Sequence, residues 1–486
     1  VLAGVSRHER CCRAEIDRLE GELEETRDRH RQLKEWATWI QNRFGPFENA
    51  FPGRCLEALH TVRSRGLVPT ARILAGRLTP AWLRTRVRRW ANHRCETELE
   101  RSLARHRGRV VVTFPIISWK LRWQRPQQIL SRLARKGYTV VYVALELQAR
   151  GRRYGGREEA ARDLSLARLE PDIFELWLHS ETPCDIYQHA LEGGDLENAH
   201  LGLAAFLARW RIADPLCLVQ FPSWTPLAQR IAPEFGGRII FDCMDNHSGF
   251  SNTTPSALQE EKDLITRADL VLTSAQVLCD RAARVNRNTI LLNNGTEFDH
   301  FHRPQPNGEL DHLEGGPVIG YFGAISDWFD IDLVTWCARA RKAWHFVLIG
   351  CTYGCDTGRA EKLENVHFLG EKPYAELPGY LAYFDVCTIP FRITPLTEAT
   401  NPVKFYEYMS SGKPVVATPL PELLPYRDYC YLAEGPADFL AKLELALAEQ
   451  GDRGFAEKRI ALARENSWDA RVDMLLANRI FKQAGA

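Results

Sequence analysis

The stretch TNPVKFYEYMSSGKPVVAT, at residues 400–418, carries the signals of a helix followed by a buried strand. Asn401 is a residue type that caps helices and Pro402 suits a first helical turn, so the sequence predicts a helix at 403–410. Gly412 ends that helix, and the apolar run at 414–417 predicts the strand. The start of such a helix presents unpaired backbone N–H groups and the positive end of its dipole, which together suit a diphosphate.

Two charged side chains follow on one face of this predicted helix. Lys404 lies in the first turn, where its ammonium adds positive charge. Glu407 comes three residues later, so the two side chains are neighbours, and its carboxylate can accept hydrogen bonds from both hydroxyls of a ribose. A Lys and a Glu at this spacing usually form a surface ion pair, but the cap, the proline and the strand entry favour a nucleotide site.

Strands and helices alternate along most of the chain before and after this stretch. Apolar runs at 110–114 and 139–143 enclose a helical pattern at 127–136, which is the βαβ unit of a parallel sheet. Further strands are predicted at 216–221, 238–241, 270–273, 318–323, 346–350, 366–369, 386–390 and 414–417. The fold class is therefore α/β, with two Rossmann-like doubly wound domains whose carboxyl-end edges face a cleft. We expect these domains at 106–300 and 301–486, with the last helix, at 467–482, returning to the first domain.

A helical N-terminal region is expected at 1–105. Residues 13–41 carry a heptad seam typical of a coiled coil or a helical hairpin, and an oligomer or partner contact and packing within the chain stay open as alternatives. Residues 80–94 read as an amphipathic helix rich in arginine and tryptophan. Such a helix can lie on an anionic membrane surface, here the cytoplasmic face of the inner membrane, or it can pack its tryptophans on the main body.

The composition predicts a folded chain in a reducing compartment, the cytoplasm. The 486 residues suggest two or three domains, and a net charge of +1 gives no overall attraction to nucleic acid. The 13 cysteines show no framework spacing, and several lie in apolar runs. No apolar run reaches the length of about 18 residues that a membrane span needs. The sequence begins at Val1 rather than Met, which is compatible with a start inside a longer polypeptide.

Several motifs resemble family 4 glycosyltransferases of the GT-B fold. The segment at 400–418 resembles the family's donor-binding segment, and Asn294-Gly295 before Phe301 is similar to its linker motif. IGYFG at 319–323 resembles the first strand and glycine turn of the C-terminal domain, and VHFLG at 366–370 with Pro373-Tyr374 resembles the segment that frames the base. WQRPQ at 123–127 and DCMD at 242–245 resemble a bacterial envelope-polysaccharide subgroup.

The resemblance implies transfer of a hexosyl or deoxyhexosyl group, with retention, from a UDP-, GDP- or dTDP-sugar. The acceptor would be a glycan or lipid-linked glycan in envelope polysaccharide synthesis. No cofactor or metal is expected, and Asp330-Ile331-Asp332 is interpreted as a helix start. A sugar-nucleotide epimerase of the same fold is one alternative. A catalytically degenerate scaffold is another, because Ala399 stands where many relatives carry a glutamate.

On the donor side, the resemblance implies that Lys404 and Asn401 meet the diphosphate and that Glu407 meets the ribose. It also places in the donor site residues of the glycine turns and of the flanking loops, which are Gly323, Ala324, Gly350, Tyr374 and Thr400.

On the acceptor side, Asp242 and Asp245 follow the predicted strand at 238–241 and should open into the cleft, with His247 close behind. Asp245 could orient or deprotonate an acceptor hydroxyl, so it joins Lys404 and Glu407 as a catalytic candidate. Capping of loop N–H groups by both carboxylates is an equal alternative. Trp119 and Arg125 are further acceptor-side candidates.

Overall fold

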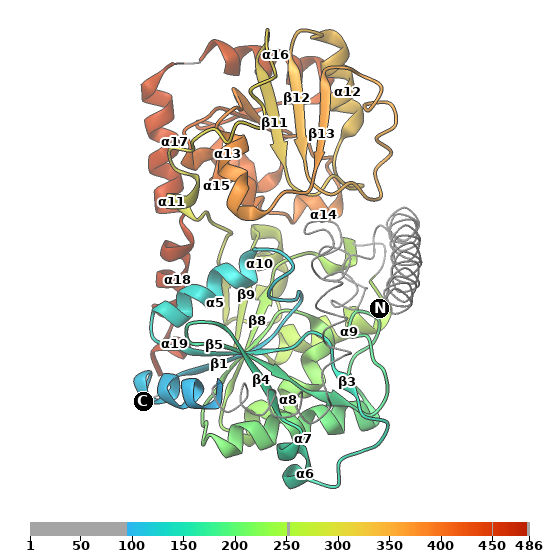
Figure 1. The fold of residues 1–486 in the computed structure, drawn as a ribbon, viewed down its shortest axis with the longest axis vertical. Helices are drawn as coiled ribbons and strands as arrows, with labels where there is room; N and C mark the ends of the chain where they lie inside the picture. The colour runs from blue at the N-terminus through green and yellow to red at the C-terminus, as the bar shows by residue number, and fades with distance from the viewer. Residues whose placement is uncertain (1–94, 250–252, 450, 484–486) are drawn as a thin grey trace, which may run out of the picture. The chain divides into compact units, whose positions relative to one another are not determined.

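The computed structural model describes residues 95–249, 253–449 and 451–483. The heptad segment at 13–41 and the arginine- and tryptophan-rich segment at 80–94 lie outside these residues. In the described part of the chain, two separate parallel-type sheets carry helices on their faces (Figure 1), which confirms the predicted α/β fold class.

The first sheet has eight strands in the order β10-β9-β8-β7-β1-β2-β5-β4. All neighbours are parallel except β4 and β5, which pair antiparallel at one edge. The strands are β1 (Val110–Phe114), β2 (Thr139–Val143), β4 (Ser165–Glu170), β5 (Ile173–Trp177), β7 (Leu216–Val219), β8 (Arg238–Cys243), β9 (Leu270–Thr273) and β10 (Thr289–Leu291). A small parallel pair lies outside the sheet, formed by β3 (Gln148–Ala149) and β6 (His179–Ser180).

The continuous apolar strands follow from burial on both faces of this sheet. In β1, Val110, Val112 and Phe114 join one core, whereas Val111 between them joins the core on the opposite face. A strand buried on both faces therefore reads as a nearly continuous apolar run rather than as an alternation of apolar and polar residues. The covering helices are α5 (Arg125–Arg135), α6 (Arg157–Arg162), α7 (Gly193–Arg209), α8 (Thr225–Glu234), α9 (Pro255–Arg267) and α10 (Gln276–Ala283).

The second sheet has six parallel strands in the order β13-β12-β11-β14-β15-β16. They are β11 (Val318–Phe322), β12 (His345–Ile349), β13 (Val366–Gly370), β14 (Val386–Ile389), β15 (Val415–Ala417) and β16 (Tyr431–Leu432). The helices of this half are α11 (Phe298–Phe301), α12 (Ile331–Ala340), α13 (Leu377–Leu381), α14 (Pro395–Glu398), α15 (Val403–Ser410), α16 (Gly435–Ala448) and α17 (Arg453–Glu465).

The C-terminal segment packs against the first sheet rather than the second. It forms two helices, α18 (Trp468–Leu476) and α19 (Arg479–Gln483), where a single helix was predicted. Trp468 and Phe481 belong to the same core as residues of β1 and α5, and the Tyr138 hydroxyl donates to the Phe481 carbonyl at 2.8 Å. Figure 1 shows α18 beside α5.

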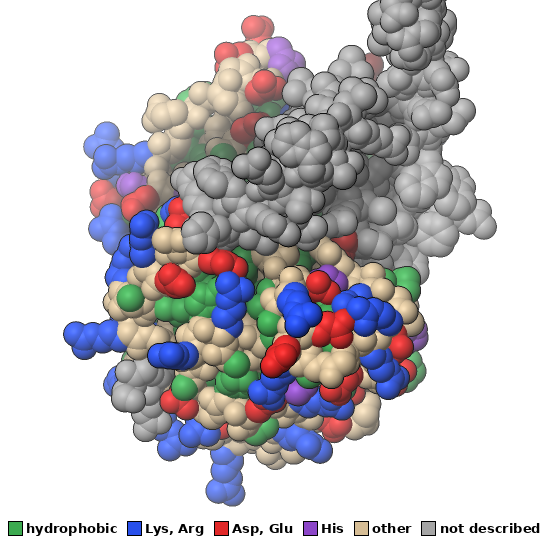
Figure 2. Space-filling model, turned by 60° about the horizontal axis from the view of Figure 1, so that its bottom comes forward, with side chains coloured by type: hydrophobic (Ala, Val, Ile, Leu, Met, Phe, Trp, Pro, Cys, Tyr) green, Lys and Arg blue, Asp and Glu red, His purple; other side chains and the backbone are tan. Residues whose placement is uncertain are grey.

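The described surface carries both signs of charge. Figure 2 shows blue and red side chains interleaved on one face. Salt bridges among α6, α7 and α8 belong to this pattern, including Arg157–Glu234 and Arg230–Glu197. None of the helices in the described part of the chain combines the length and the apolar character that crossing a bilayer requires.

The return of the C-terminal segment predicts a large stability effect at one tryptophan. Trp468 is 1% exposed, so Trp468→Ala should lower the free energy of unfolding by about 3–5 kcal/mol. Trp336 on α12 is 43% exposed, and Trp336→Ala should cost less than about 1 kcal/mol. Urea unfolding followed by circular dichroism measures both, and equal losses would contradict the packing described.

Candidate active site

Helix α15 occupies the predicted residues, but its first turn is built differently from the expectation. Pro402 is the residue before the first helical residue, and no side chain caps the helix there. The predicted capping by Asn401 is therefore wrong. The Asn401 amide is 3% exposed and bonds elsewhere, to the Asn294 backbone N–H and to the Glu422 carboxylate. These tertiary partners outcompete the local cap.

The Lys404 side chain reaches from α15 to the carboxyl end of β11. Its Cε lies 2.7 Å from where a Cβ on Gly323 would be, and Gly323 has φ +138°, so this position requires glycine. The Lys404 Nζ lies 5.3 Å from the ring centre of Tyr321 and 4.9 Å from that of Phe391. Burial lowers the pKa of Lys404 to about 8, although the nearby Glu407 opposes this shift.

Glu407 is the second charged group of α15 and is 6% exposed. Burial raises its pKa to about 8; Lys404 opposes that rise, and Glu297 adds to it. Glu297 thus lies close enough to Glu407 to disfavour its charge, and it accepts a hydrogen bond from Gln128 Nε2 at 3.3 Å. Nothing in the sequence places Glu297, which follows the linker motif at Asn294-Gly295, beside α15.

Tyr374 joins this group from the loop after β13. Gln128 of α5 donates to the Tyr374 hydroxyl at 3.1 Å, and the Tyr374 ring stacks on His300 with ring centres 4.8 Å apart. Burial raises the pKa of Tyr374, and Glu407 and Glu297 contribute further. Helix α5 of the first sheet therefore supplies a side chain to the donor-side group, which the sequence analysis missed.

The remaining donor-side candidates fall into two sets. Gly350 has φ +155°, and a Cβ there would lie 1.8 Å from the Gly323 carbonyl oxygen, so the two glycine turns touch. Ala324 follows directly, and its carbonyl accepts the Tyr321 hydroxyl at 2.7 Å. The Thr400 hydroxyl instead donates to the Leu396 carbonyl at 2.8 Å, which leaves it committed to its own loop.

On the acceptor side, Asp242 and Arg125 form a buried ion pair. Asp242 is 0% exposed and Arg125 is 4% exposed, and the Arg125 Nη2–Asp242 Oδ1 distance is 2.8 Å. Arg125 also donates to the Leu292 carbonyl at 2.8 Å and to Asn294 Oδ1 at 3.1 Å. The pair therefore ties α5 to β8 and to the linker, which is a structural arrangement.

Asp245 and His247 lie just beyond the end of β8. Burial raises the pKa of Asp245 to about 6, with Arg125 opposing and Asp242 adding to the shift. Burial lowers the pKa of His247 to about 4, and Arg281 contributes. Burial therefore favours the neutral form of both groups.

Trp119 is a packed residue in this structure. It is 5% exposed and meets Trp123 and Tyr142 edge-on, at ring-centre distances of 5.9 and 5.2 Å.

The described residues contain no group of three His, Cys, Asp or Glu side chains arranged to hold a metal ion. Asp330 caps α12 by accepting the Leu333 N–H at 3.0 Å, as the interpretation of Asp330-Ile331-Asp332 as a helix start requires. Neither Cys351 nor Cys355 forms a disulfide.

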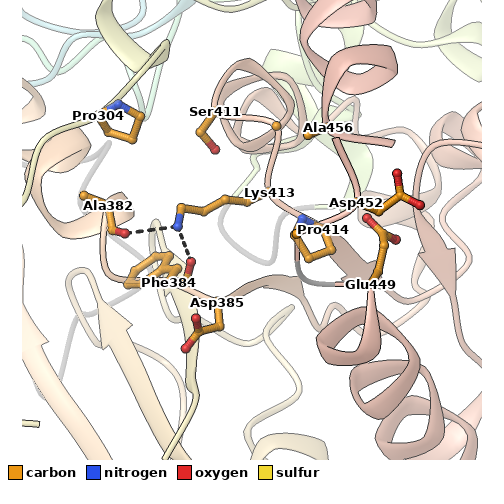
Figure 3. Close-up of a pocket in the computed structure, with 12 residues that line it drawn as sticks. Pro304, Ala382, Phe384, Asp385, Ser411, Lys413, Pro414, Glu449, Asp452 and Ala456 are labelled. Carbon is orange, nitrogen blue, oxygen red and sulfur yellow. Dashed lines mark hydrogen bonds between the residues drawn. The ribbon is translucent and has the colours of Figure 1, made fainter. Parts of the chain in front are cut away.

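A cavity of about 310 Å³ lies at the amino-terminal ends of β14 and β15, whereas the group around Lys404 lies at the carboxyl end of β11 (Figure 3). Its polar groups are already engaged within the chain. Lys413 donates to the carbonyls of Ala382 and Phe384, and Glu449 pairs with Arg459. Asp452 caps α17. The lining residues include none of the group around Lys404, so the two sites are separate.

Comparisons with known proteins decide the family. The model of "Glycosyl transferases group 1" matches residues 316–449, which include β11, α15 and most of the donor-side group. The chain is 30% identical over 271 residues to TuaH of Bacillus subtilis (strain 168), named as a teichuronic acid biosynthesis glycosyltransferase. That match covers 51% of this chain and 67% of TuaH. The chain belongs to the group 1 glycosyltransferases. It is accordingly an enzyme that uses a nucleotide-sugar donor.

Solved structures share the fold of this glycosyltransferase. Sucrose-phosphate synthase from Thermosynechococcus elongatus has a TM-score of 0.57 at 15% identity and covers 75% of this chain and 96% of its own. Anabaena HepE in complex with UDP has a TM-score of 0.53 at 14% identity, covering 76% and 98%. Escherichia coli trehalose-6-phosphate synthase bound with UDP-2-fluoro glucose has a TM-score of 0.54 at 14% identity, covering 77% and 99%. These matches identify the two-sheet architecture as GT-B.

The buried ion pair predicts that Asp242 matters first for stability. Asp242→Asn leaves the buried Arg125 charge without its counterion and should lower the free energy of unfolding by about 3–5 kcal/mol. Glu197→Gln, which breaks the exposed pair with Arg230, should cost less than about 1 kcal/mol. Urea unfolding of the two variants provides the test. An Asp242→Asn protein as stable as the wild type would contradict the structural interpretation.

Proposed function

We propose that this glycosyltransferase moves a sugar, with retention, from a nucleotide-diphosphate donor to a glycan or lipid-linked glycan in envelope polysaccharide synthesis. The observation that carries the donor side is the ammonium of Lys404, which lies beside Gly323 and one helical turn before Glu407. The likeness to TuaH, named for teichuronic acid biosynthesis, supports the acceptor class.

We propose UDP as the nucleotide of the donor. HepE binds UDP in its solved complex, and the trehalose-6-phosphate synthase structure holds UDP-2-fluoro glucose. In this chain the diphosphate would contact the first turn of α15 and Lys404, and the ribose would contact Glu407. Tyr374, stacked on His300, would border the base. Gly323 would let the phosphates approach the backbone closely, with Gly350 and Ala324 beside it at the glycine turns.

The proposed reaction breaks the bond between the anomeric carbon and the diphosphate oxygen and forms a bond from that carbon to an acceptor oxygen. Negative charge grows on the leaving diphosphate, where Lys404 and the helix start stabilise it. In a front-face reaction the acceptor proton passes to the departing diphosphate oxygen, so a nucleoside diphosphate and the glycosylated acceptor leave. Asp245 would orient the acceptor hydroxyl, because its raised proton affinity suits an exchange of hydrogen bonds with a hydroxyl.

Lys404→Ala tests the leaving-group role. A thermal-shift screen against UDP-, GDP- and dTDP-sugars first selects the donor, and release of the nucleoside diphosphate then reports turnover. The variant should lose about 10²–10³-fold in kcat, because it removes charge stabilisation of the leaving group. Its melting temperature should not fall, since burial opposes the charge that the substitution removes. Lys458→Ala, at an exposed position of α17, is the control, and wild-type turnover by Lys404→Ala would refute the assignment.

The pKa of Lys404 also predicts a pH dependence. In the donor-free enzyme the ammonium loses its proton as the pH rises through about 8, and a bound diphosphate favours the charged form. The affinity for UDP should therefore fall above pH 8, by up to about tenfold per pH unit. Titration calorimetry between about pH 7 and pH 10 measures this decrease in affinity. The arginine of Lys404→Arg keeps its charge throughout this range, so the affinity of this variant should depend less on pH. An unchanged pH dependence would assign the loss of affinity to another group.

A further inference from the structure

One carboxylate joins three segments of the chain that are far apart in sequence. Glu422 lies in the 3₁₀ turn Pro421–Tyr426 after β15 and is 7% exposed. Its Oε1 accepts the backbone N–H of Gln276 at 2.6 Å. Its Oε2 accepts the side-chain amides of Asn293 and Asn401, each at 2.9 Å. Glu422 thus connects helix α10 of the first sheet, the linker and the approach to α15.

The first of these contacts caps α10 from the other half of the chain. Ala275, the residue before α10, has no capping side chain, and the first turn of this helix contains no acidic residue. A helix start without a local cap leaves N–H donors unpaired and a positive dipole end uncompensated. The Glu422 carboxylate supplies both the acceptor and the negative charge at Gln276.

The third contact fixes Asn401, three residues before Lys404. The Asn401 Oδ1 accepts the backbone N–H of Asn294 at 3.0 Å, and the backbone carbonyl of Asn401 accepts the Asn294 Nδ2–H at 2.7 Å. The Asn401 Nδ2 donates to Glu422 and, at 3.2 Å, to the Tyr406 hydroxyl. A carboxylate can only accept hydrogen bonds, so Glu422 requires the NH₂ side of this amide to face it. The opposite side of the amide must then face Asn294.

We propose that Glu422 is a positioning residue for the sugar transfer. It orients Asn401, and through Asn401 it orients the first turn of α15. Lys404 and the backbone N–H groups of that turn would bind the diphosphate. This inference rests on the proposed function, since it names a residue that acts through the same donor site without touching the donor. Charge on Glu422 is essential to the arrangement, because three N–H donors converge on its two oxygens.

The variant Glu422→Gln isolates this role with almost no change in volume. Its amide offers one oxygen and one NH₂ group, so at least one of the three donors faces another donor. Asn401 is then no longer held in one orientation. We expect the UDP affinity to fall roughly tenfold, measured by titration calorimetry below the melting transition. Glu457→Gln, an exposed carboxylate on α17 of the same half, is the matched control and should bind UDP like the wild type.

A double-variant cycle separates positioning from a purely structural role. If Glu422 acts through the tip of α15, Glu422→Gln should change UDP affinity less than about twofold once Lys404→Ala is present. If Glu422 only stabilises the fold, the folded Glu422→Gln protein should bind UDP normally. Normal binding, or a full and additive loss in the Lys404→Ala background, would overturn the proposal.

Hydrogen exchange without nucleotide distinguishes failure of this inference from failure of the proposed function. In Glu422→Gln, peptides covering 274–279, 292–296 and 400–406 should all exchange faster than in the wild type and in Glu457→Gln. If the wild type binds no UDP, the proposed donor is wrong, and this pattern still decides whether Glu422 holds α15. Faster exchange at 274–279 alone would reduce Glu422 to a helix cap and overturn the positioning role.

Discussion

Two asparagines hold the start of α15 in place, and the proposed donor site depends on them. Asn294 and Asn401 exchange two hydrogen bonds, so the chain that leaves the first sheet is joined to the chain that enters α15. Helix α15 has 8 residues, and a helix this short has little stability of its own in water. The direction of its first turn, and hence of Lys404, is therefore set by tertiary contacts, which are these asparagine bonds and the core packing of the helix's own buried residues.

Burial of both charged groups on α15 gives the site its electrostatic character. Lys404 and Glu407 are each shifted toward their neutral forms by desolvation, so the empty site is poorly suited to hold charge. Under the proposed function, a bound diphosphate would reverse this balance at Lys404 by supplying an anion beside the ammonium. Groups fixed in a site with little water do not need to reorganise when charge develops on a leaving group. Under the proposed function, the burial that disfavours these charges in the free enzyme would serve the charged state of the reaction.

The sequence predicted local elements well and side-chain partners poorly. The bounds of α15 and β9 match the expectation, because apolar runs, a proline before a helix and a glycine after it are local signals. The antiparallel pair β4 and β5 was missed, since its residues are partly exposed and mix polar with apolar types. The partner of Arg125 is Asp242, 117 residues away, and Asn401 bonds Asn294 at a separation of 107 residues. No spacing rule within the sequence reaches across such distances.

Directional hydrogen bonds tie the two halves of the chain together, beside the apolar packing of the C-terminal segment. From Asp242 the bonds pass through Arg125 to Asn294, then to Asn401 and Glu422, which returns to the first half at Gln276. A reaction in which the acceptor oxygen attacks on the face that the diphosphate leaves requires reacting atoms about 3–3.5 Å apart. An apolar contact would permit sliding of one sheet edge past the other, because the hydrophobic effect has no direction. Buried hydrogen bonds with fixed donors and acceptors favour one arrangement, because any displacement would leave buried polar groups unpaired at a cost in free energy. Under the proposed reaction, this series of hydrogen bonds would hold α15, on the donor side, in a fixed position relative to the end of β8, on the acceptor side.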